Sequence, residues 1–443
     1  YFSSTFRDWA RVNTINGTAL NPILANPSAN QTAYQIMTGS ADGPIEYQSA
    51  ARTYQAKGVE SQIQYVLNTD NINSKAQLGI RYHKDQADRY ATKSTYTMTR
   101  GIMVLTVAGI KGNSENQIRK ANSLAAFFNY NVNFKGLSIT PGIRYEDIYF
   151  EFLNYGNADA ARLGTALKSA TNRMKILLPG VGINYQIDHR MNLYAGAHKG
   201  FSPPGMPSLG SSEQARPETA VNYELGFRFE QKGLRLDVAG FHSDYDNILG
   251  SDNVSGGGAG TGAMFNAGNA LIQGLEFSLA CDLRGNNQNN TNWKIPLQIS
   301  YTFTDARFKD SFRNAGGDWG SGMIYRNDEI PFIPKHALSV NLGFEHKKIT
   351  ATFSARYVGL TRTKPGQGSL ITPSEQSTYD AVNSIASFLI VDFSTNYRIS
   401  KGISCFNTLN NITNNRNIVA NLPNGYRPNM PFGIMLGLKA DIR

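Results

Sequence analysis

The sequence contains few charged residues, no long hydrophobic run and almost no cysteine. Charged side chains make up 17% of the 443 residues and apolar ones 41%. No run of about 18 apolar residues occurs, so a transmembrane helix is excluded. Even the apolar stretch Phe388–Val391 is followed at once by Asp392. The two cysteines, Cys281 and Cys405, lie far apart on segments that we expect not to be neighbours, so neither a disulfide nor a metal site is predicted.

The first residues of the chain and its net charge bear on targeting and on possible partners. The sequence opens with Tyr1 and not with a basic and then apolar segment, so a signal peptide is absent. We expect that the beginning of the chain is missing. The formal charge is +10, but Lys and Arg are scattered singly and no basic helix or RNA-binding pattern occurs. We therefore expect no nucleic-acid partner, and an anionic lipid A surface or an anionic ligand fits the charge better.

What the sequence does contain is alternation with a period of two. In the segment 337–345, Leu338, Val340 and Leu342 alternate with Ser339 and Asn341, and the same pattern recurs along the whole chain. A helix would need apolar spacings of three and four, which these segments lack. The pattern predicts about sixteen strands, each long enough to cross a bilayer when tilted. They span 1–9, 51–68, 75–86, 119–133, 136–152, 173–186, 189–200, 216–230, 233–248, 268–284, 292–306, 334–345, 348–361, 386–399, 402–412 and 429–442.

The connections between these strands alternate in length. The long ones are 10–50, 87–118, 153–172, 201–215, 249–267, 307–333, 362–385 and 413–428, with a hairpin or extended piece expected at 97–109. Short turns on one side and long loops on the other are typical of an outer-membrane β-barrel, whereas a soluble sandwich gives no reason for them. We predict one all-β domain over 1–443, an antiparallel transmembrane β-barrel with extracellular long loops and a periplasmic C-terminus.

Several motifs occur in an order that resembles one protein family. The segment 198–204 (HKGFSPP) leads into 216–228 (RPETAVNYELGFR), and 265–269 (FNAGN) is followed by 273–276 (QGLE). Further matches are 79–85, 141–146, 301–306, 333–336, 410–414, 427–432 and 437–439. Together they resemble TonB-dependent receptors over roughly residues 75–443, and the ferric-citrate receptor group most closely through 79–85 and 198–204.

The resemblance implies more chain than is present. Such receptors have about 22 strands and a plugged lumen, and nothing in the sequence resembles the plug or the box that contacts TonB. The resemblance therefore implies that the plug and the first strands are absent here. It also implies import of a ferric chelate across a Gram-negative outer membrane that contains lipopolysaccharide. The resemblance implies that this import is driven through TonB by the inner-membrane proton gradient. Neither a catalytic role nor an intrinsic cofactor is implied.

Arginine is the residue type that suits an anionic iron chelate, because its planar donors match carboxylate oxygens. By parity Arg81 and Arg144 face inward, and Arg89 is expected just above a strand top. The resemblance to ferric-citrate receptors implies arginines from these early strands and an Asn in the last loop, for which Asn424 is chosen. Arg326 and Arg362 are further loop candidates. The simpler interpretation is that inward charges such as Arg144, Glu146, Glu224 and Arg228 form structural ion pairs in the lumen.

Other functions are less well supported. The six histidines show no metal-ligand spacing and do not match the boxes of haem receptors of this family. The glycine-rich 255–262 lacks the Lys-Ser/Thr of a phosphate loop, and no strained serine elbow indicates a hydrolase. The alternative from another class is a passive porin with sixteen strands, complete in this chain, which a plug encoded upstream of Tyr1 would exclude.

Overall fold

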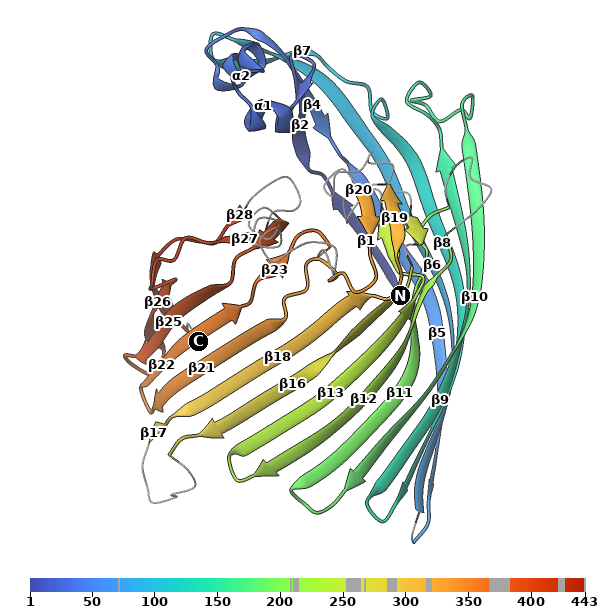
Figure 1. The fold of residues 1–443 in the computed structure, drawn as a ribbon, viewed down its shortest axis with the longest axis vertical. Coiled ribbons are helices and arrows are strands. Elements are labelled where there is room, and N and C mark those ends of the chain that lie inside the picture. Colours follow the sequence, from blue (N-terminus) through green and yellow to red (C-terminus); the bar gives the residue numbers. More distant parts are fainter. Residues whose placement is uncertain are drawn as a thin grey trace.

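The computed structural model describes residues 1–70, 72–207, 209, 215–251, 264–266, 268–284, 293–315, 321–365, 383–420 and 427–441. Its main feature is one strongly curved antiparallel sheet of 21 strands (Figure 1). Five of these are short strands, β2 (Ala10–Ile15), β3 (Thr18–Ala19), β4 (Gly43–Ser49), β7 (Ile102–Val107) and β17 (Trp293–Lys294), and the other sixteen form a continuous wall. In order of pairing they are β1 (Phe2–Arg7), β5 (Arg52–Asn68), β6 (Ile72–Thr99), β8 (Glu115–Phe134), β9 (Leu137–Asn154), β10 (Lys168–Gln186), β11 (Met191–Ser202), β12 (Glu218–Gln231), β13 (Leu234–Asp246), β16 (Ala270–Asp282), β18 (Pro296–Phe308), β21 (His336–His346), β22 (Ile349–Val358), β25 (Phe388–Arg398), β26 (Ile403–Asn410) and β29 (Gly433–Ala440).

Each of the sixteen predicted strands corresponds to one strand of this wall, so the period-two prediction is confirmed. The connections alternate as expected, with short turns along the lower edge in Figure 1 and long connections along the upper edge. The long connections contain short strands, namely β14 (Leu249–Ser251), β15 (Met264–Asn266), β19 (Phe312–Ala315), β20 (Ser321–Ile324), β23 (Thr361–Arg362), β24 (Ser384–Ile385), β27 (Ile418–Ala420) and β28 (Arg427–Pro428); β17 (Trp293–Lys294) lies below β18. In the described chain β1 pairs only with β5 and β29 only with β26, so these two strands are the edges of the wall.

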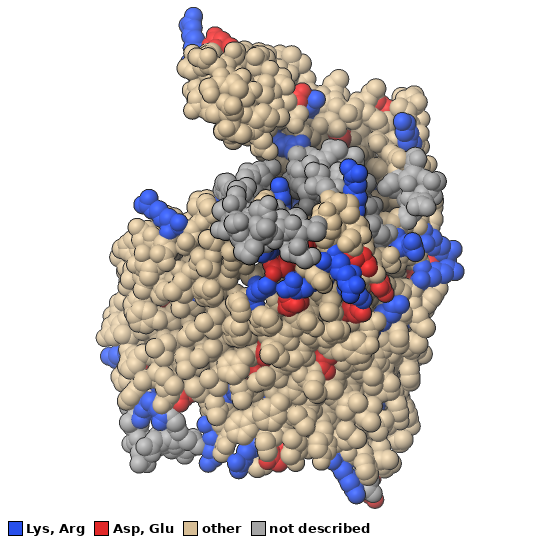
Figure 2. Space-filling view, in the orientation of Figure 1, with Lys and Arg blue, Asp and Glu red and all other residues tan. Residues whose placement is uncertain are grey.

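The two faces of the wall differ in the way that the alternation predicts. On β6, Leu78, Ile80 and Tyr82 are 57%, 53% and 45% exposed, and similar apolar side chains cover the same face of the neighbouring strands. We call this the outer face and the opposite one, with Arg81 and His83, the inner face. Figure 2 shows a broad band of the wall almost without Lys, Arg, Asp or Glu, with charged side chains gathered above and below it. Neither helix in the described chain is long and apolar enough to span a membrane.

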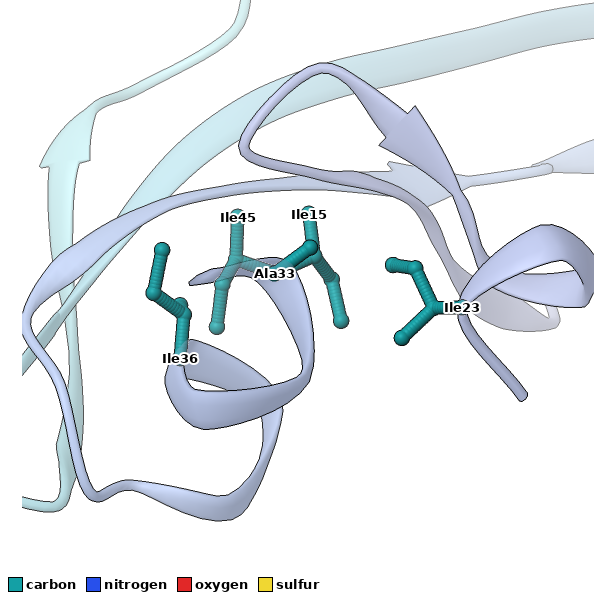
Figure 3. Close-up of a cluster of buried hydrophobic side chains, with 5 residues drawn as sticks. All are labelled: Ile15, Ile23, Ala33, Ile36 and Ile45. Atoms are coloured by element: carbon teal, nitrogen blue, oxygen red, sulfur yellow. The ribbon is translucent and has the colours of Figure 1, made fainter. Parts of the chain in front are cut away.

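The prediction of a loop over 10–50 is wrong. This segment forms β2 (Ala10–Ile15), β3 (Thr18–Ala19), α1 (Leu20–Ala25), α2 (Gln31–Thr38) and β4 (Gly43–Ser49). Together with the upper part of β6 and with β7 (Ile102–Val107) these elements make what we call the upper module (Figure 1). The helices pack on the sheet through a core of five buried residues, Ile15, Ile23, Ala33, Ile36 and Ile45 (Figure 3).

The upper module was missed because its helices are too short for a periodic pattern to appear. Helix α2 has eight residues and ends at Gly39, whose φ of 77° is the left-handed conformation that glycine adopts easily at a helix end. Short helices are marginal in isolation and are stabilised mainly by tertiary packing. Here that packing comes from Ile15 and Ile45 on strands β2 and β4.

The predicted loop 87–118 is also wrong in its first part. Strand β6 does not stop at 86 but continues to Thr99, pairing with β5 through Arg89 and then with β4 from Thr92 to Met98. The hairpin expected at 97–109 is confirmed by the pairing of β6 with β7. As a consequence, Arg89 lies within a strand and not above its top.

Candidate functional site

Three arginines from three neighbouring strands meet on the inner face above the apolar band, which on β6 ends at Tyr82. Arg52 of β5 lies directly opposite Arg89 of β6, and Arg119 of β8 lies opposite Ala87. The Arg89 Nη2 is 2.9 Å from Glu115 Oε1, and the Arg52 Nη2 is 3.8 Å from Glu115 Oε2. We call Arg52, Arg89 and Arg119 the arginine cluster.

The arginine cluster has more positive charge than its surroundings balance. Three guanidinium groups share the one carboxylate of Glu115, and the side chains of Arg52 and Arg89 are only 21% and 17% exposed. Burial, together with the charges of Arg119 and Arg52, lowers the pKa of Arg89 to about 10 against the opposing effect of Glu115. Burial also lowers the pKa of Arg119, again opposed by Glu115. A low pKa in a cation means that the charged form is disfavoured in this environment.

Hydrogen bonding in the arginine cluster is incomplete. Within the described chain, the Nε atoms of all three arginines are buried and have no acceptor. A cavity of about 260 Å³ opens beside Arg119 on the inner face, and Tyr54, Asp85 and Met206 are among its lining residues. An anion with several oxygen atoms would provide both the acceptors and the negative charge that this site lacks.

Arg81 and Arg144 lie on the inner face as predicted, but lower on the wall. The Arg81 Nε donates to the Tyr1 hydroxyl at 3.2 Å. The Arg144 Nε donates to Glu146 Oε1 at 2.7 Å, which agrees with the structural ion pair that was the simpler interpretation. Arg81 and Arg89 are eight residues apart on one strand, or about 26 Å at about 3.3 Å per residue. The structure therefore does not bring these arginines into a single site.

The remaining predicted residues lie elsewhere. Arg362 belongs to a second cluster around Glu329, whose carboxylate oxygens are 2.5 Å from Arg362 Nε and 2.5 Å from Lys335 Nζ. Burial alone would raise the pKa of Glu329, but the hydrogen bonds from Lys335 and Arg362 outweigh it and lower the pKa. Arg326 is exposed, and Asn424 lies outside the described residues.

Arg52 and Arg119 are not among the site residues predicted from the sequence. The hairpin between β5 and β6 pairs Asn68 with Asn73, and the same register carried upward pairs Arg52 with Arg89. If the strand predicted over 75–86 is extended by three residues, this register places Arg52 and Arg89 face to face. Finding Arg119 required the register of β8 against β6, which no short turn determines because a long connection separates them.

Glycines form a bare patch on the inner face of β10 and β11. Gly182 lies opposite Gly196, and in the described chain a Cβ added at Gly182 would meet nothing within 4 Å. By contrast, a Cβ at Gly79 would come within 2.2 Å of the Phe127 ring, so that ring leaves no space for a side chain at Gly79. Glycine weakens a strand by about 0.5–1 kcal/mol and often marks a place where another backbone approaches closely. The patch thus suits a segment lying against the inner wall.

The described residues contain no group of three or more His, Cys, Asp or Glu side chains that could hold a metal ion. Cys281 and Cys405 are both free thiols. The inner face presents ion pairs and hydrogen bonds such as Arg228 with Asp237 at 2.7 Å. What the described site offers is recognition of an anion through guanidinium groups.

Comparison with known proteins agrees with this architecture. The model of the family described as "TonB dependent receptor-like, beta-barrel" matches residues 2–413. The chain is 24% identical over 238 residues to the ferric enterobactin receptor of Pseudomonas aeruginosa, covering 50% of this chain and 31% of that protein. It is 25% identical over 259 residues to an uncharacterized TonB-dependent receptor of Haemophilus influenzae, covering 56% of this chain and 68% of that one.

Solved structures share the fold. The ferric citrate transporter FecA in its unliganded form superposes with a TM-score of 0.65 at 17% identity, covering 90% of this chain and 58% of that one. The siderophore receptor PiuA from Acinetobacter baumannii gives 0.68 at 13% identity, covering 99% and 61%. The chain thus spans about three fifths of the length of these two structures. With the family match over nearly its whole length, the chain belongs to the TonB-dependent receptor-like β-barrel family.

Proposed function

We propose that this chain is the barrel part of an outer-membrane receptor that imports an anionic ferric chelate, ferric citrate or a related iron–siderophore, with energy supplied through TonB. The observation that supports this most directly is the arginine cluster, in which three half-buried guanidinium groups face one carboxylate, Glu115. Ferric citrate is an anion with many acceptor oxygens, so it supplies what the cluster lacks.

In this proposal the long connections are extracellular and the C-terminus is periplasmic, so the arginine cluster lies at the outer mouth of the barrel. Arg81 and Arg144 are proposed as deeper contacts along the path, and Arg326, Arg362 and Asn424 as contacts at the rim. The outer face, with its exposed Leu78 and Ile80, lies in an outer membrane containing lipopolysaccharide.

The mechanism has two parts. The arginine cluster captures the chelate from the medium, since Glu115 balances only part of its buried positive charge and a bound anion supplies the rest. A plug that the same polypeptide would contribute then rearranges when TonB acts on it, and the glycine patch around Gly182 offers it a flat wall to lie against. Iron crosses as the intact chelate, so the protein performs no chemistry on it.

Two alternatives are weaker. A passive porin complete in this chain would need β1 to pair with β29, whereas in the described chain each pairs with one other strand.

A second inner cavity of about 750 Å³, lined in part by Arg356, Asp392 and Asn411, is a rival binding site. There a single basic residue, Arg356, is accompanied by the acid Asp392. The cavity beside Arg119 is also lined by one acid, Asp85, but Arg119 belongs to a cluster of three arginines, so an anion gains more there.

The test is a binding screen of the receptor encoded by the complete gene against ferric citrate, a ferric catecholate, haem and cobalamin. We expect ferric citrate or a similar anionic chelate to bind, and Arg89→Gln with Arg119→Gln to weaken it. Each lost charge-assisted hydrogen bond contributes about 1.5–3 kcal/mol, so affinity falls by about tenfold or more. Arg235→Gln, an exposed pair with Glu230 near a hairpin turn, is the matched control. Binding of none of the iron chelates would overturn the function, and unchanged affinity in the double variant would overturn the site.

A further inference from the structure

A row of side chains with basic residues at both of its ends runs across the outer face immediately above the apolar band. The strand registers place Lys57 of β5 opposite Lys84 of β6, and Lys84 opposite Asn122 of β8. The same row continues through Tyr149 of β9 to Arg173 of β10. The row below it holds Tyr82, Leu124, Asp147 and Lys175, so these cations adjoin the first apolar side chains of the band.

The cations at the two ends of this row are not fully balanced by acids. Lys57 and Lys84 face each other directly, and in the described chain neither forms an ion pair; Lys84 lies over the Tyr82 ring at 5.4 Å. Like charges directly opposite each other destabilise a sheet. At the other end, Arg173 and the neighbouring Lys175 of the row below are 58% and 57% exposed and share one acid, Asp147, at 2.7 and 3.9 Å. We call Lys57, Lys84, Arg173 and Lys175 the outer basic patch.

This excess of positive charge is local. In the row above, Lys120 is balanced by Glu151 at 2.8 Å. On the strands β13 and β18, the corresponding upper edge of the outer face carries ion pairs, Lys309 with Asp244 at 2.7 Å and Arg307 with Asp305 at 2.9 Å. In Figure 2 basic side chains gather at the edge of the molecule where Figure 1 places β10, whereas the charges near β16 and β18 are of both signs.

We propose that the outer basic patch binds the phosphorylated headgroup of an anionic glycolipid in the outer leaflet, one that has two phosphates on a disaccharide. The proposal rests on the membrane orientation given above. A lipid is the occupant because the cations adjoin the apolar band, where acyl chains run along Tyr82 and Leu124 while the headgroup reaches the row above.

The spacing of the patch favours two phosphates over one. Lys84 on β6 and Arg173 on β10 belong to one row and are three strand spacings apart, or about 14 Å at about 4.8 Å per strand. One phosphate binds between Lys57 and Lys84 and relieves their repulsion, and the other binds Arg173 and Lys175. A phospholipid such as phosphatidylglycerol has a single phosphate and reaches only one end.

The experiment uses the receptor encoded by the complete gene, purified in detergent, with native mass spectrometry to measure bound lipid. We expect bisphosphorylated lipid A to bind at least about tenfold more tightly than monophosphorylated lipid A or phosphatidylglycerol, and added salt to weaken it. The variant Lys57→Gln, Lys84→Gln, Arg173→Gln and Lys175→Gln should lose this preference, and it should fold because these side chains lie on the surface. The control Arg307→Gln with Lys309→Gln changes charge at the corresponding edge and should keep the preference.

Equal binding of the three lipids, or an unchanged preference in the fourfold variant, would overturn the proposal. Ferric chelate binding is measured on the same samples and should be equal in wild type and the fourfold variant, because the patch lies on the face opposite the arginine cluster. A receptor that binds chelate without the lipid preference would refute the outer basic patch alone. A receptor that shows the lipid preference but binds no chelate would refute the proposed function alone.

Discussion

Arg89 and Glu115 form an ion pair of 2.9 Å across two paired strands, and the same carboxylate is also the acid nearest to Arg52. Glu115 therefore holds together a group of like charges that would otherwise repel one another. It also competes with any anion that enters the site. These two roles make opposite predictions for stability and for binding.

Replacing Glu115 by Gln should strengthen binding of an anionic chelate and weaken the folded protein. The charge excess of the arginine cluster increases, so we expect affinity to rise about threefold to tenfold while the free energy of unfolding falls by about 1–3 kcal/mol. Binding titration and denaturant unfolding of the same variant measure both effects. Glu151→Gln removes an acid of the outer face, paired with Lys120, and should leave chelate affinity unchanged. Weaker chelate binding in Glu115→Gln would contradict the arrangement.

Low pH should destabilise the connection between β20 and β21, which contains Glu329. Its pKa is lowered in the folded protein, since the hydrogen bonds from Lys335 and Arg362 outweigh burial. The stabilisation is thus fully present above the ordinary value of 4.5 and is lost as the pH falls through the lowered folded pKa. Hydrogen exchange of amides 325–335, corrected for intrinsic rates, should show protection that is constant from pH 7 to about pH 5 and then falls.

The Glu329→Gln variant is the control for this effect. It cannot form the charged contacts, so its 325–335 segment should be less protected at neutral pH and should lack the acid transition. If the wild-type segment is as well protected at about pH 3 as at pH 6, these ion pairs do not hold the connection in place.

The upper module should depend on its small core. Ile36 is 1% exposed between α2 and the sheet, and truncation of a buried isoleucine to alanine costs about 2–5 kcal/mol. We expect Ile36→Ala to open residues 20–42 to limited proteolysis while the wall stays intact. Ile102→Ala, at a position 67% exposed in the same module, should change nothing. Unaltered cleavage in Ile36→Ala would show that the module is held by contacts other than this core.

Prediction from sequence succeeded for the wall and failed for the upper module for one physical reason. A strand such as β22 shows its two faces through its own alternation, and Ile349, Phe353 and Tyr357 needed no partner to be assigned to one side. Helix α1 is six residues long and buries only Ile23, so its pattern is too short to detect. Its existence depends on residues of β2 and β4 that pack against it.

The candidate site shows the same division. The sequence by itself determined that Arg81 and Arg144 face inward, because side-chain direction in a strand follows from residue parity alone. Only the tertiary structure decided that Arg89 meets Arg52 and Arg119, while Arg81 and Arg144 bind other partners. Proximity across strands depends on register, and where long connections separate the strands that register is set by packing of the whole wall and not by any local pattern.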